Sequence, residues 1–297
     1  MDVRGGTSAG GLAGLLAAEA GGRLGDAGTA VLKDTRVTVV RAGDTVVKAL
    51  PPGTDAGALQ ARLTAAASMP GVFLPPLSPR VRHLAGRPVT SWPAGEPVDP
   101  ADPYGAPWEE AAALLARLHA SPVPPSLPPH GGPARVTRAV AGLPRGERHA
   151  AAVRTISAAY VPLGLEAGHE PGAAPVHGDW HLGQVVRYRG EWLLIDVDDL
   201  GSGDPAWDLA RPAAWFATGL LDPELWARFL GAYLSAGGTA VSPDDPWREL
   251  DRPARALTVQ LAATAVAAAH GEGRPLDDVE DALVSSCGRI VGVTPSR

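Results

Sequence analysis

A predicted β-hairpin with acidic residues on both sides constrains the fold of this chain more than any other sequence feature. Two short runs, 185–188 and 192–195, are rich in β-branched, aromatic and other apolar residues, and Arg189-Gly190 separates them. A glycine turn between two such runs predicts a hairpin. The acidic residues that flank this hairpin indicate what it positions.

Acidic and amide side chains occur both before and after the hairpin. Asp179 precedes it, and Gln184 follows Asp179 by five residues. The second strand is expected to end at Asp196, and Asp198 and Asp199 come directly afterwards. Carboxylate oxygens are the ligands that hard divalent cations prefer. We therefore expect the Asp179 loop and the strand end at Asp196 to hold a divalent cation.

The segment that starts at residue 177 contains HGDWHLGQ, LLIDVDD and GDPAWDLA, in that order. This series resembles the aminoglycoside phosphotransferase family, which shares the protein-kinase fold with choline kinases and maltokinases. The family pattern is H-G-D-x-x-x-x-N, a hairpin, I-D, and then G-D-P-x-x-D-L-A. Gln184 stands where the family has Asn. Maltokinase-like sugar kinases carry a similar HGD-x-HLGQ form.

The resemblance implies an α+β, protein-kinase-like fold with two lobes. A small β-rich N-lobe, residues 1–93, would bind the nucleotide phosphates, and a larger, mostly helical C-lobe, residues 94–297, would carry the catalytic loop and the acceptor site. In the N-lobe, strands are expected at 30–32, 37–41, 45–50 and 88–92, and a helix at 55–68. In the C-lobe, helices are expected at 107–120, 146–163, 206–217, 224–236, 247–270 and 277–291, with a Pro/Gly-rich connector at 121–134.

The composition argues against several other classes of protein. A net charge of −6 gives no reason to expect a nucleic-acid partner. No stretch approaches the roughly 20 apolar residues of a membrane span. Cys287 is the only cysteine, so no disulfide can form within the chain, and the N-terminus lacks the pattern of a signal peptide. We expect a cytoplasmic protein, monomeric or homodimeric.

Lys48 is one of only two lysines among 26 lysine and arginine residues, and it lies in the third predicted strand. The resemblance implies that it binds the nucleotide phosphates; the alternative is a solvent-facing strand lysine. The helix that follows lacks the glutamate that pairs with this lysine in kinases, and the sequence leaves open whether Gln60 or Asp55 replaces it. Ser91 and Trp92 would lie beside the adenine, in the segment that joins the lobes.

The resemblance also implies the cofactors ATP and magnesium and the roles of four residues. Asp179 would orient the attacking hydroxyl of the acceptor. Gln184 and Asp196 would bind magnesium, which accepts two protein ligands together with phosphate oxygens and water. Asp198 would be a further ligand or would contact the acceptor.

Three further residues are candidates for the acceptor site, each with a structural alternative. His181 contacts the acceptor or belongs to the core. Arg211 binds an acidic group or pairs with an aspartate. Trp215, like Trp180 and Trp207, forms an apolar wall for a sugar ring or is simply packed. His177, Asp204 and Asp208 are expected to be structural, with Asp204 as a helix cap and Asp208 as a structural anchor.

The favoured function is an ATP- and magnesium-dependent kinase acting on a hydroxyl of a sugar or amino sugar such as glucosamine. Phosphorylation of an aminoglycoside antibiotic is the alternative: the acid-rich motif favours a cationic acceptor, either an amino sugar or an aminoglycoside, and the maltokinase-like HLGQ favours a sugar. A metal-dependent hydrolase is a third possibility, since His177, Asp179 and His181 form an H-x-D-x-H set that resembles zinc ligands. A pseudokinase that binds nucleotide without turnover is the fourth.

Overall fold

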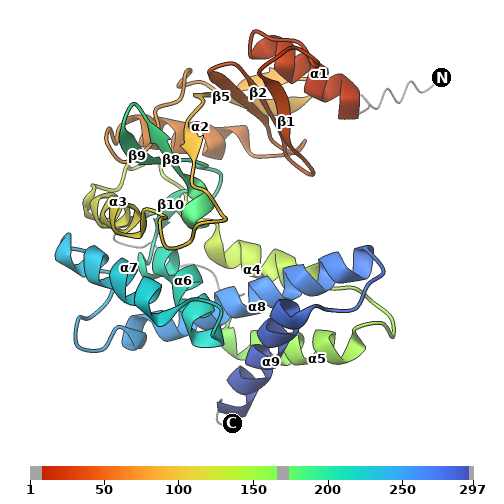
Figure 1. The fold of residues 1–297 in the computed structure, drawn as a ribbon, viewed down its shortest axis with the longest axis vertical. Helices are drawn as coiled ribbons and strands as arrows, with labels where there is room; N and C mark the ends of the chain where they lie inside the picture. The colour runs from red at the N-terminus through yellow and green to blue at the C-terminus, as the bar shows by residue number, and fades with distance from the viewer. Residues whose placement is uncertain (1–8, 166–173, 294–297) are drawn as a thin grey trace. The chain divides into compact units, whose positions relative to one another are not determined.

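The computed structural model describes residues 9–165 and 174–293, which form two compact units (Figure 1). Among these residues, the first unit comprises those up to Ala101, with Pro124–Pro128 and Gly183–Asp198, and the second unit comprises the rest. The expected lobe boundary near residue 94 falls inside the first of these stretches. The predicted hairpin belongs to the first unit, although it is far from the N-terminal sheet in sequence.

The first unit is built mainly from strands. Its elements are α1 (Ala9–Glu19), β1 (Thr29–Asp34), β2 (Thr38–Ala42), β3 (Thr45–Ala49), α2 (Ala56–Ala67), β4 (Arg82–Leu84), β5 (Arg87–Pro93), β6 (Glu96–Pro97), β8 (Val185–Tyr188) and β9 (Glu191–Leu194). The strands and the helix predicted from the N-terminal sequence are thus confirmed, within a few residues at each end.

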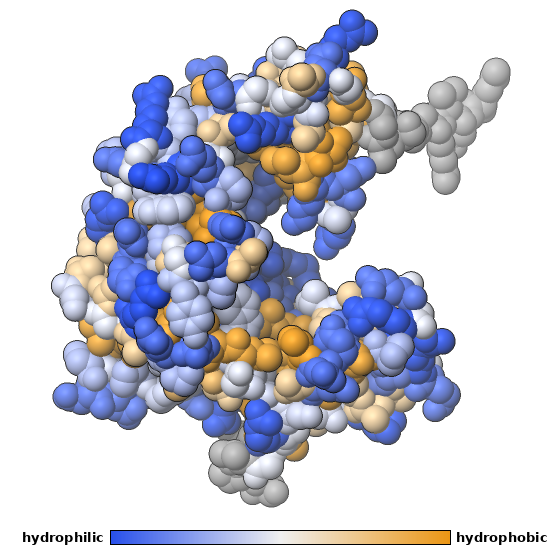
Figure 2. All heavy atoms as spheres, in the orientation of Figure 1, coloured by the Kyte–Doolittle hydropathy of each residue, from blue (hydrophilic) through white to orange (hydrophobic). Residues whose placement is uncertain are grey.

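An antiparallel sheet with the strand order β1-β2-β3-β5-β4 is the framework of this unit. Helix α1 packs against β2 and β3, and Leu16 of the helix lies in one core cluster with Val40, Val47 and Val89. These four side chains are almost fully buried. Val31 and Leu32 on the outer strand β1 are 43% and 57% exposed, and a hydrophobic area is visible over the sheet of this unit in Figure 2.

The predicted hairpin is confirmed as β8 and β9, which form a small antiparallel sheet with β6. Arg189 and Gly190 at its turn have φ values of 52° and 89°, as in the two-residue turns that match the twist of paired strands. The amide of Leu74 donates to the carbonyl of Leu194 (2.9 Å), and the amide of Leu194 donates to the carbonyl of Val72 (2.8 Å). These bonds tie the hairpin to the segment that follows α2.

The second unit is mainly helical. Its elements are α3 (Trp108–Ala120), α4 (Gly132–Ala141), α5 (Ala150–Tyr160), η1 (Val161–Leu163), β7 (Ala174–Val176), β10 (Gly201–Gly203), α6 (Ala206–Thr218), α7 (Pro223–Ser235), α8 (Trp247–Gly271) and α9 (Asp278–Val293). The 3-10 turn η3 (Leu182–Gln184) spans the point where the chain passes into the first unit.

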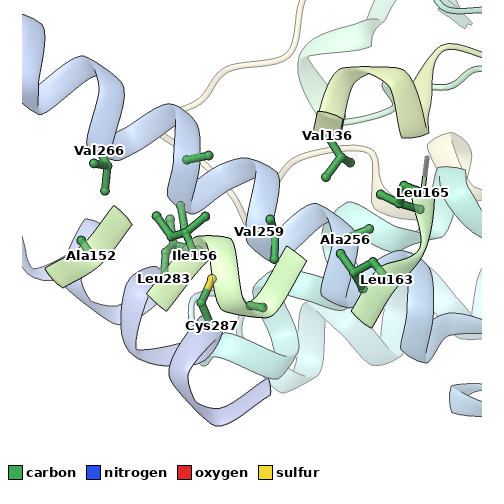
Figure 3. Close-up of a cluster of buried hydrophobic side chains, with 13 residues drawn as sticks. Val136, Ala152, Ile156, Leu163, Leu165, Ala256, Val259, Val266, Leu283 and Cys287 are labelled. Carbon is green, nitrogen blue, oxygen red and sulfur yellow. The ribbon is translucent and has the colours of Figure 1, made fainter. Parts of the chain in front are cut away.

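Helix α8 is central to the second unit, because α4, α5, α6 and α9 all contact it. Side chains from four of these helices meet in one core cluster (Figure 3), which includes Val136, Ile156, Val259, Leu283 and Cys287. Each of the five is buried. The helices predicted from apolar periodicity are confirmed here, since each presents an apolar stripe to this core or to the α3–α7 pair.

Helix α4 was not predicted. Residues 121–134 were expected to be a connector, but α4 begins at Gly132, with Pro133 in its first turn. Proline is favoured at that point because the first amides of a helix have no partner within it. The Pro/Gly-rich sequence therefore concealed a helix start. Within the described residues, no helix is both long enough and apolar enough to cross a membrane.

Candidate active site

Lys48 on β3 forms two ion pairs with the chain at the end of the hairpin. Its Nζ lies 2.7 Å from Oδ1 of Asp196 and 2.7 Å from Oδ2 of Asp198. The side chain is only 12% exposed. Burial by itself would lower the pKa of Lys48, but the two carboxylates raise that pKa above its ordinary value. The lysine is therefore a stable cation, and one ammonium with two carboxylates leaves a formal negative charge at this position.

The backbone at Asp196 is held in an uncommon conformation. Its φ is 64°, in the left-handed region, which aspartate tolerates better than most residues but which still costs about 1–3 kcal/mol. The preceding residue, Ile195, donates its amide to the carbonyl of Gln184 (2.9 Å). Gln184 itself is 8% exposed. The three predicted metal ligands thus belong to one unit, with Asp198 two residues after Asp196.

The oxygen donors at the hairpin end suit magnesium. Two carboxylates and one amide oxygen are hard ligands, and they leave coordination positions for phosphate oxygens and water, as is usual for this ion. Among the described residues, no group of three or more His, Cys, Asp or Glu side chains forms a ready-made metal site. Gln184, Asp196 and Asp198 would hold the ion if it binds here.

Neither expected substitute for the missing glutamate pairs with Lys48. Gln60 accepts a hydrogen bond from the amide of Val81 (2.9 Å) and donates to the carbonyl of Pro79 (2.5 Å). Asp55 caps α2 by accepting from the amides of Gly57 (2.9 Å) and Ala58 (3.0 Å). Both side chains bind nearby backbone instead, and the carboxylates that pair with the lysine are those of Asp196 and Asp198.

Ser91 and Trp92 lie inside β5, paired with Val47 and Val46 of β3. The carbonyl of Ser91 also accepts a hydrogen bond from the amide of Leu77 (2.8 Å). The Trp92 indole is 8% exposed and donates to Oγ1 of Thr90 (2.9 Å). Their contact with an adenine ring stays a prediction.

Asp179 in the second unit is held by two arginines. Its Oδ1 accepts a hydrogen bond from Nη2 of Arg211 (2.6 Å), and its Oδ2 lies 2.8 Å from Nη2 of Arg135. Arg135 also donates through Nη1 to Oδ2 of Asp199 (2.8 Å). The Asp179 side chain is 15% exposed and that of Arg211 11%. Burial lowers the pKa of Arg211, and the adjacent Asp179 opposes that shift.

Gly178 allows the loop that carries Asp179 to pack closely against the backbone of Asp199. Its φ is +83°, and a Cβ at this position would come 2.4 Å from the carbonyl oxygen of Asp199. Only glycine combines this backbone angle with such close packing. β7, which ends immediately before the loop, pairs with β10 and fixes the loop at one end.

Asp208 on α6 binds the backbone of the same loop through both of its carboxylate oxygens. Its Oδ2 accepts from the amide of His177 (2.7 Å) and its Oδ1 from the amide of Gly178 (2.9 Å). Nε2 of His119 lies 3.1 Å from Oδ2, and Nδ1 of His119 lies 2.8 Å from the hydroxyl of Tyr233. Because Asp208 and Arg211 are one helical turn apart, α6 holds both the loop backbone and the carboxylate of Asp179.

Asp208→Asn is expected to destabilise the second unit by about 2–4 kcal/mol, because an amide cannot accept all three of these hydrogen bonds. Burial would raise the pKa of Asp208, but the hydrogen bond from His119 and the other local partners lower it below its ordinary value. The stability that the carboxylate adds is therefore complete above about pH 4 and is lost as the pH falls through the depressed pKa.

Urea unfolding of wild type and Asp208→Asn at pH 7 and at successively lower pH would measure this effect. The two stabilities should converge at low pH. A gap that stays constant down to pH 2 would show that the charge of Asp208 is not the cause.

The remaining predicted acceptor residues lie close to this network in sequence. His181 is half-buried, and Trp215 on α6 is half-buried too, so their contact with an acceptor stays a prediction. Trp180 is 2% exposed and stacks on Phe229, with ring centroids 4.9 Å apart. It is packed, and the alternative of an open apolar wall does not apply to it. Arg211 pairs with an aspartate, the second of the two possibilities considered for it.

Sequence reasoning missed Arg135. Nothing distinguishes it from the other arginines of this arginine-rich chain, and it sits at the start of the helix that was not predicted. For Arg211, the spacing was informative, because three residues after Asp208 places it on the same face of α6. That face points toward the loop whose backbone Asp208 binds.

These features define a class of enzyme: a phosphotransferase with a protein-kinase-like fold, in which a strand lysine is paired with carboxylates at a hairpin end. The chain belongs to the phosphotransferase enzyme family (APH), whose model matches residues 30–276. It is a small-molecule phosphotransferase with an alcohol group as acceptor, and membership implies ATP as the phosphoryl donor. The hydrolase interpretation is therefore wrong, and Asp179, its central zinc ligand, is occupied by two guanidinium groups.

Solved structures share this fold at low sequence identity. An amicoumacin kinase in complex with AMP-PNP, Ca²⁺ and Ami is 16% identical, with a TM-score of 0.64 over 90% of this chain and 89% of that one. A choline/ethanolamine kinase family protein from Mesorhizobium loti is 20% identical, with a TM-score of 0.60 over 92% and 90%. A thermostable mutant of an aminoglycoside phosphotransferase, in its apo form, is 12% identical, with a TM-score of 0.60 over 94% and 98%. No curated protein sequence gave a significant match.

Proposed function

We propose that this protein transfers the γ-phosphoryl group of ATP, with magnesium, to a hydroxyl of a sugar or amino sugar. The observation that carries the proposal is the pair of 2.7 Å contacts between Lys48 and the carboxylates of Asp196 and Asp198. Lys48 and Asp196 are 148 residues apart in sequence. Lys48, a cation that can bind phosphates, is thus held beside two carboxylates that can bind a metal. Binding of a metal-nucleotide complex requires both.

In this proposal Lys48 pairs first with the aspartates at the hairpin end and then with the phosphates of ATP. Without nucleotide, its ammonium compensates one of the two carboxylate charges at the hairpin end. The phosphates of ATP offer it other anionic partners, which leaves Asp196, Asp198 and Gln184 to the metal. Bound magnesium would neutralise charge on the phosphates during transfer. Because the Lys48 side chain is only 12% exposed and already paired, it loses less side-chain entropy when it binds a phosphate.

Asp179 is the group proposed to receive the acceptor hydroxyl. A carboxylate has about four lone-pair sites, so two guanidinium contacts leave it able to accept an O–H bond. In the transfer, the acceptor oxygen forms a bond to the γ-phosphorus, and the bond from that phosphorus to ADP breaks with its electron pair leaving on ADP. The hydroxyl proton passes to Asp179.

The pairing of the acidic residues favours a sugar over a polycationic antibiotic. The acid-rich sequence suggested an attraction for cations, but Asp179 and Asp199 are already compensated by Arg135 and Arg211. Little free negative charge therefore remains near Asp179 to select several ammonium groups. An aminoglycoside acceptor is the second candidate, supported by the family alone.

An acceptor screen tests the proposal. ADP release from magnesium-ATP would be measured with glucosamine, glucose, maltose, choline and kanamycin, and the phosphorylated product identified by mass spectrometry. We expect a sugar or amino sugar to give the highest kcat/KM. Turnover of kanamycin alone would establish the antibiotic kinase, and nucleotide binding without turnover of any acceptor would establish a pseudokinase.

A further inference from the structure

The contacts of Arg135 and Arg211 assign these two residues a part in the transfer reaction. We propose that they form a clamp that positions Asp179 for the acceptor hydroxyl and, by neutralising its charge, disfavours polycationic acceptors. This inference rests on the proposed function and deepens it, since it concerns the orientation of the acceptor and its class.

The clamp holds Asp179 from two helices. Arg211 of α6 approaches Oδ1 at 2.6 Å, and Arg135 of α4 approaches Oδ2 at 2.8 Å. A carboxylate held at one oxygen can still rotate about its Cβ–Cγ bond. A carboxylate held at one oxygen by a hydrogen bond and at the other by an ion pair keeps one orientation. The plane of the Asp179 carboxylate, and hence the direction of its remaining lone pairs, is therefore fixed.

The two arginines are themselves committed to this arrangement. Arg135 bridges Asp179 and Asp199 with its two terminal nitrogens, which a lysine could not do with the same planar geometry. Arg211 is 11% exposed. Its Nε is buried and makes no hydrogen bond with any described residue, a cost that natural structures seldom retain without function. The contact of Arg211 with Asp179 is what offsets its burial.

The charge of the clamp bears on the class of acceptor. Two guanidinium groups face two carboxylates, so the four groups together carry no formal net charge. A neutral sugar hydroxyl can donate a hydrogen bond to the fixed carboxylate of Asp179 without a charge penalty. Several ammonium groups near the same point would gain no net electrostatic attraction from the four groups, and specificity depends on such differences in interaction between competing ligands.

Kinetics of Arg135→Gln would test the clamp. With the sugar turned over fastest by wild type, we expect kcat to fall about 10- to 100-fold, because loss of alignment carries an effect of this size. The KM for ATP should change less than about 3-fold, since Lys48 and the hairpin acids supply the phosphate and metal contacts. Kanamycin, used as an inhibitor competitive with the sugar, should bind more tightly to this variant.

Arg138→Gln is the matched control. It removes the same charge from the same helix, one turn further on, where the side chain is 55% exposed and lies 4.0 Å from Asp199. This variant should keep the wild-type kcat. Arg135→Lys, which retains charge and most of the stem, should recover part of the activity, and it remains informative if Arg135→Gln does not fold. Melting temperatures of all variants would show that the kinetics were measured on folded protein.

Three results would decide the matter. If Arg135→Gln and Arg135→Lys match Arg138→Gln in kcat, the clamp does not position Asp179. If kcat falls but kanamycin inhibition is unchanged, the selectivity part of the proposal is wrong. If wild type phosphorylates no acceptor at all, the proposed function fails before the clamp is tested.

Discussion

Asp179→Asn is expected to lower kcat by about three to four orders of magnitude, the upper range for loss of a positioned general base. An asparagine side chain has nearly the same size but presents an NH₂ group on one side. That group would face the N–H donors of Arg135 or Arg211, so one guanidinium would lose its acceptor. The carboxamide is also a poor acceptor for the proton of the attacking hydroxyl.

Nucleotide binding should be nearly unaffected by the same substitution. Lys48, Gln184, Asp196 and Asp198 belong to the first unit, and the ion pairs of Asp179 are all within the second. The dissociation constant of magnesium-AMP-PNP, measured by calorimetry, should stay within about 3-fold of wild type.

Stability gives a second readout for Asp179→Asn. One buried guanidinium without its counter-charge should cost about 1–3 kcal/mol in the free energy of unfolding. Asp244→Asn, which removes a charge from an exposed position, is the control for both assays. Turnover of Asp179→Asn within 10-fold of the control would remove Asp179 from the mechanism.

Much of the fold was predictable because local signals and the global fold agree. The Arg189-Gly190 turn and the apolar stripe of α3, with Leu114, Leu115 and Leu118 fully buried, are both encoded within a few residues. Patterns of this kind depend on backbone geometry and on burial of one face, and both can be inferred from sequence spacing. The ordered motifs around the hairpin then indicated the family.

The partners of the site residues were less predictable, because they depend on packing between segments far apart in the chain. Lys48 was expected to pair with the next helix, but the sheet and hairpin together bring it to Asp196 and Asp198. Arg135 lies on a helix that a Pro/Gly-rich sequence concealed. Neither the pairing of Lys48 with the two aspartates nor that of Arg135 with Asp179 produces a periodic or short-range pattern in the sequence. These pairings are seen only in the three-dimensional structure.

Asp196 is the residue whose loss should most reduce metal-dependent nucleotide binding. Removal of its carboxylate leaves Lys48 paired with Asp198 at 2.7 Å, so the formal charge at the hairpin end changes from negative to neutral. The attraction for a divalent cation then falls together with the number of ligands. For Asp196→Ala we expect magnesium to improve the affinity for AMP-PNP by less than about 2-fold, against about 10-fold or more in wild type.

Two substitutions separate the charge of Asp196 from its backbone conformation. Its φ of 64° favours Asp or Asn over Ala, so Asp196→Ala adds a backbone penalty that Asp196→Asn largely avoids. Calorimetric titrations of both variants with AMP-PNP, in magnesium and in EDTA, would show the same loss of metal dependence if the carboxylate is the ligand. If both variants bind nucleotide in magnesium as tightly as wild type, Asp196 does not hold the metal. Other residues would then bind it, and the ion pair of Lys48 with Asp196 would be structural.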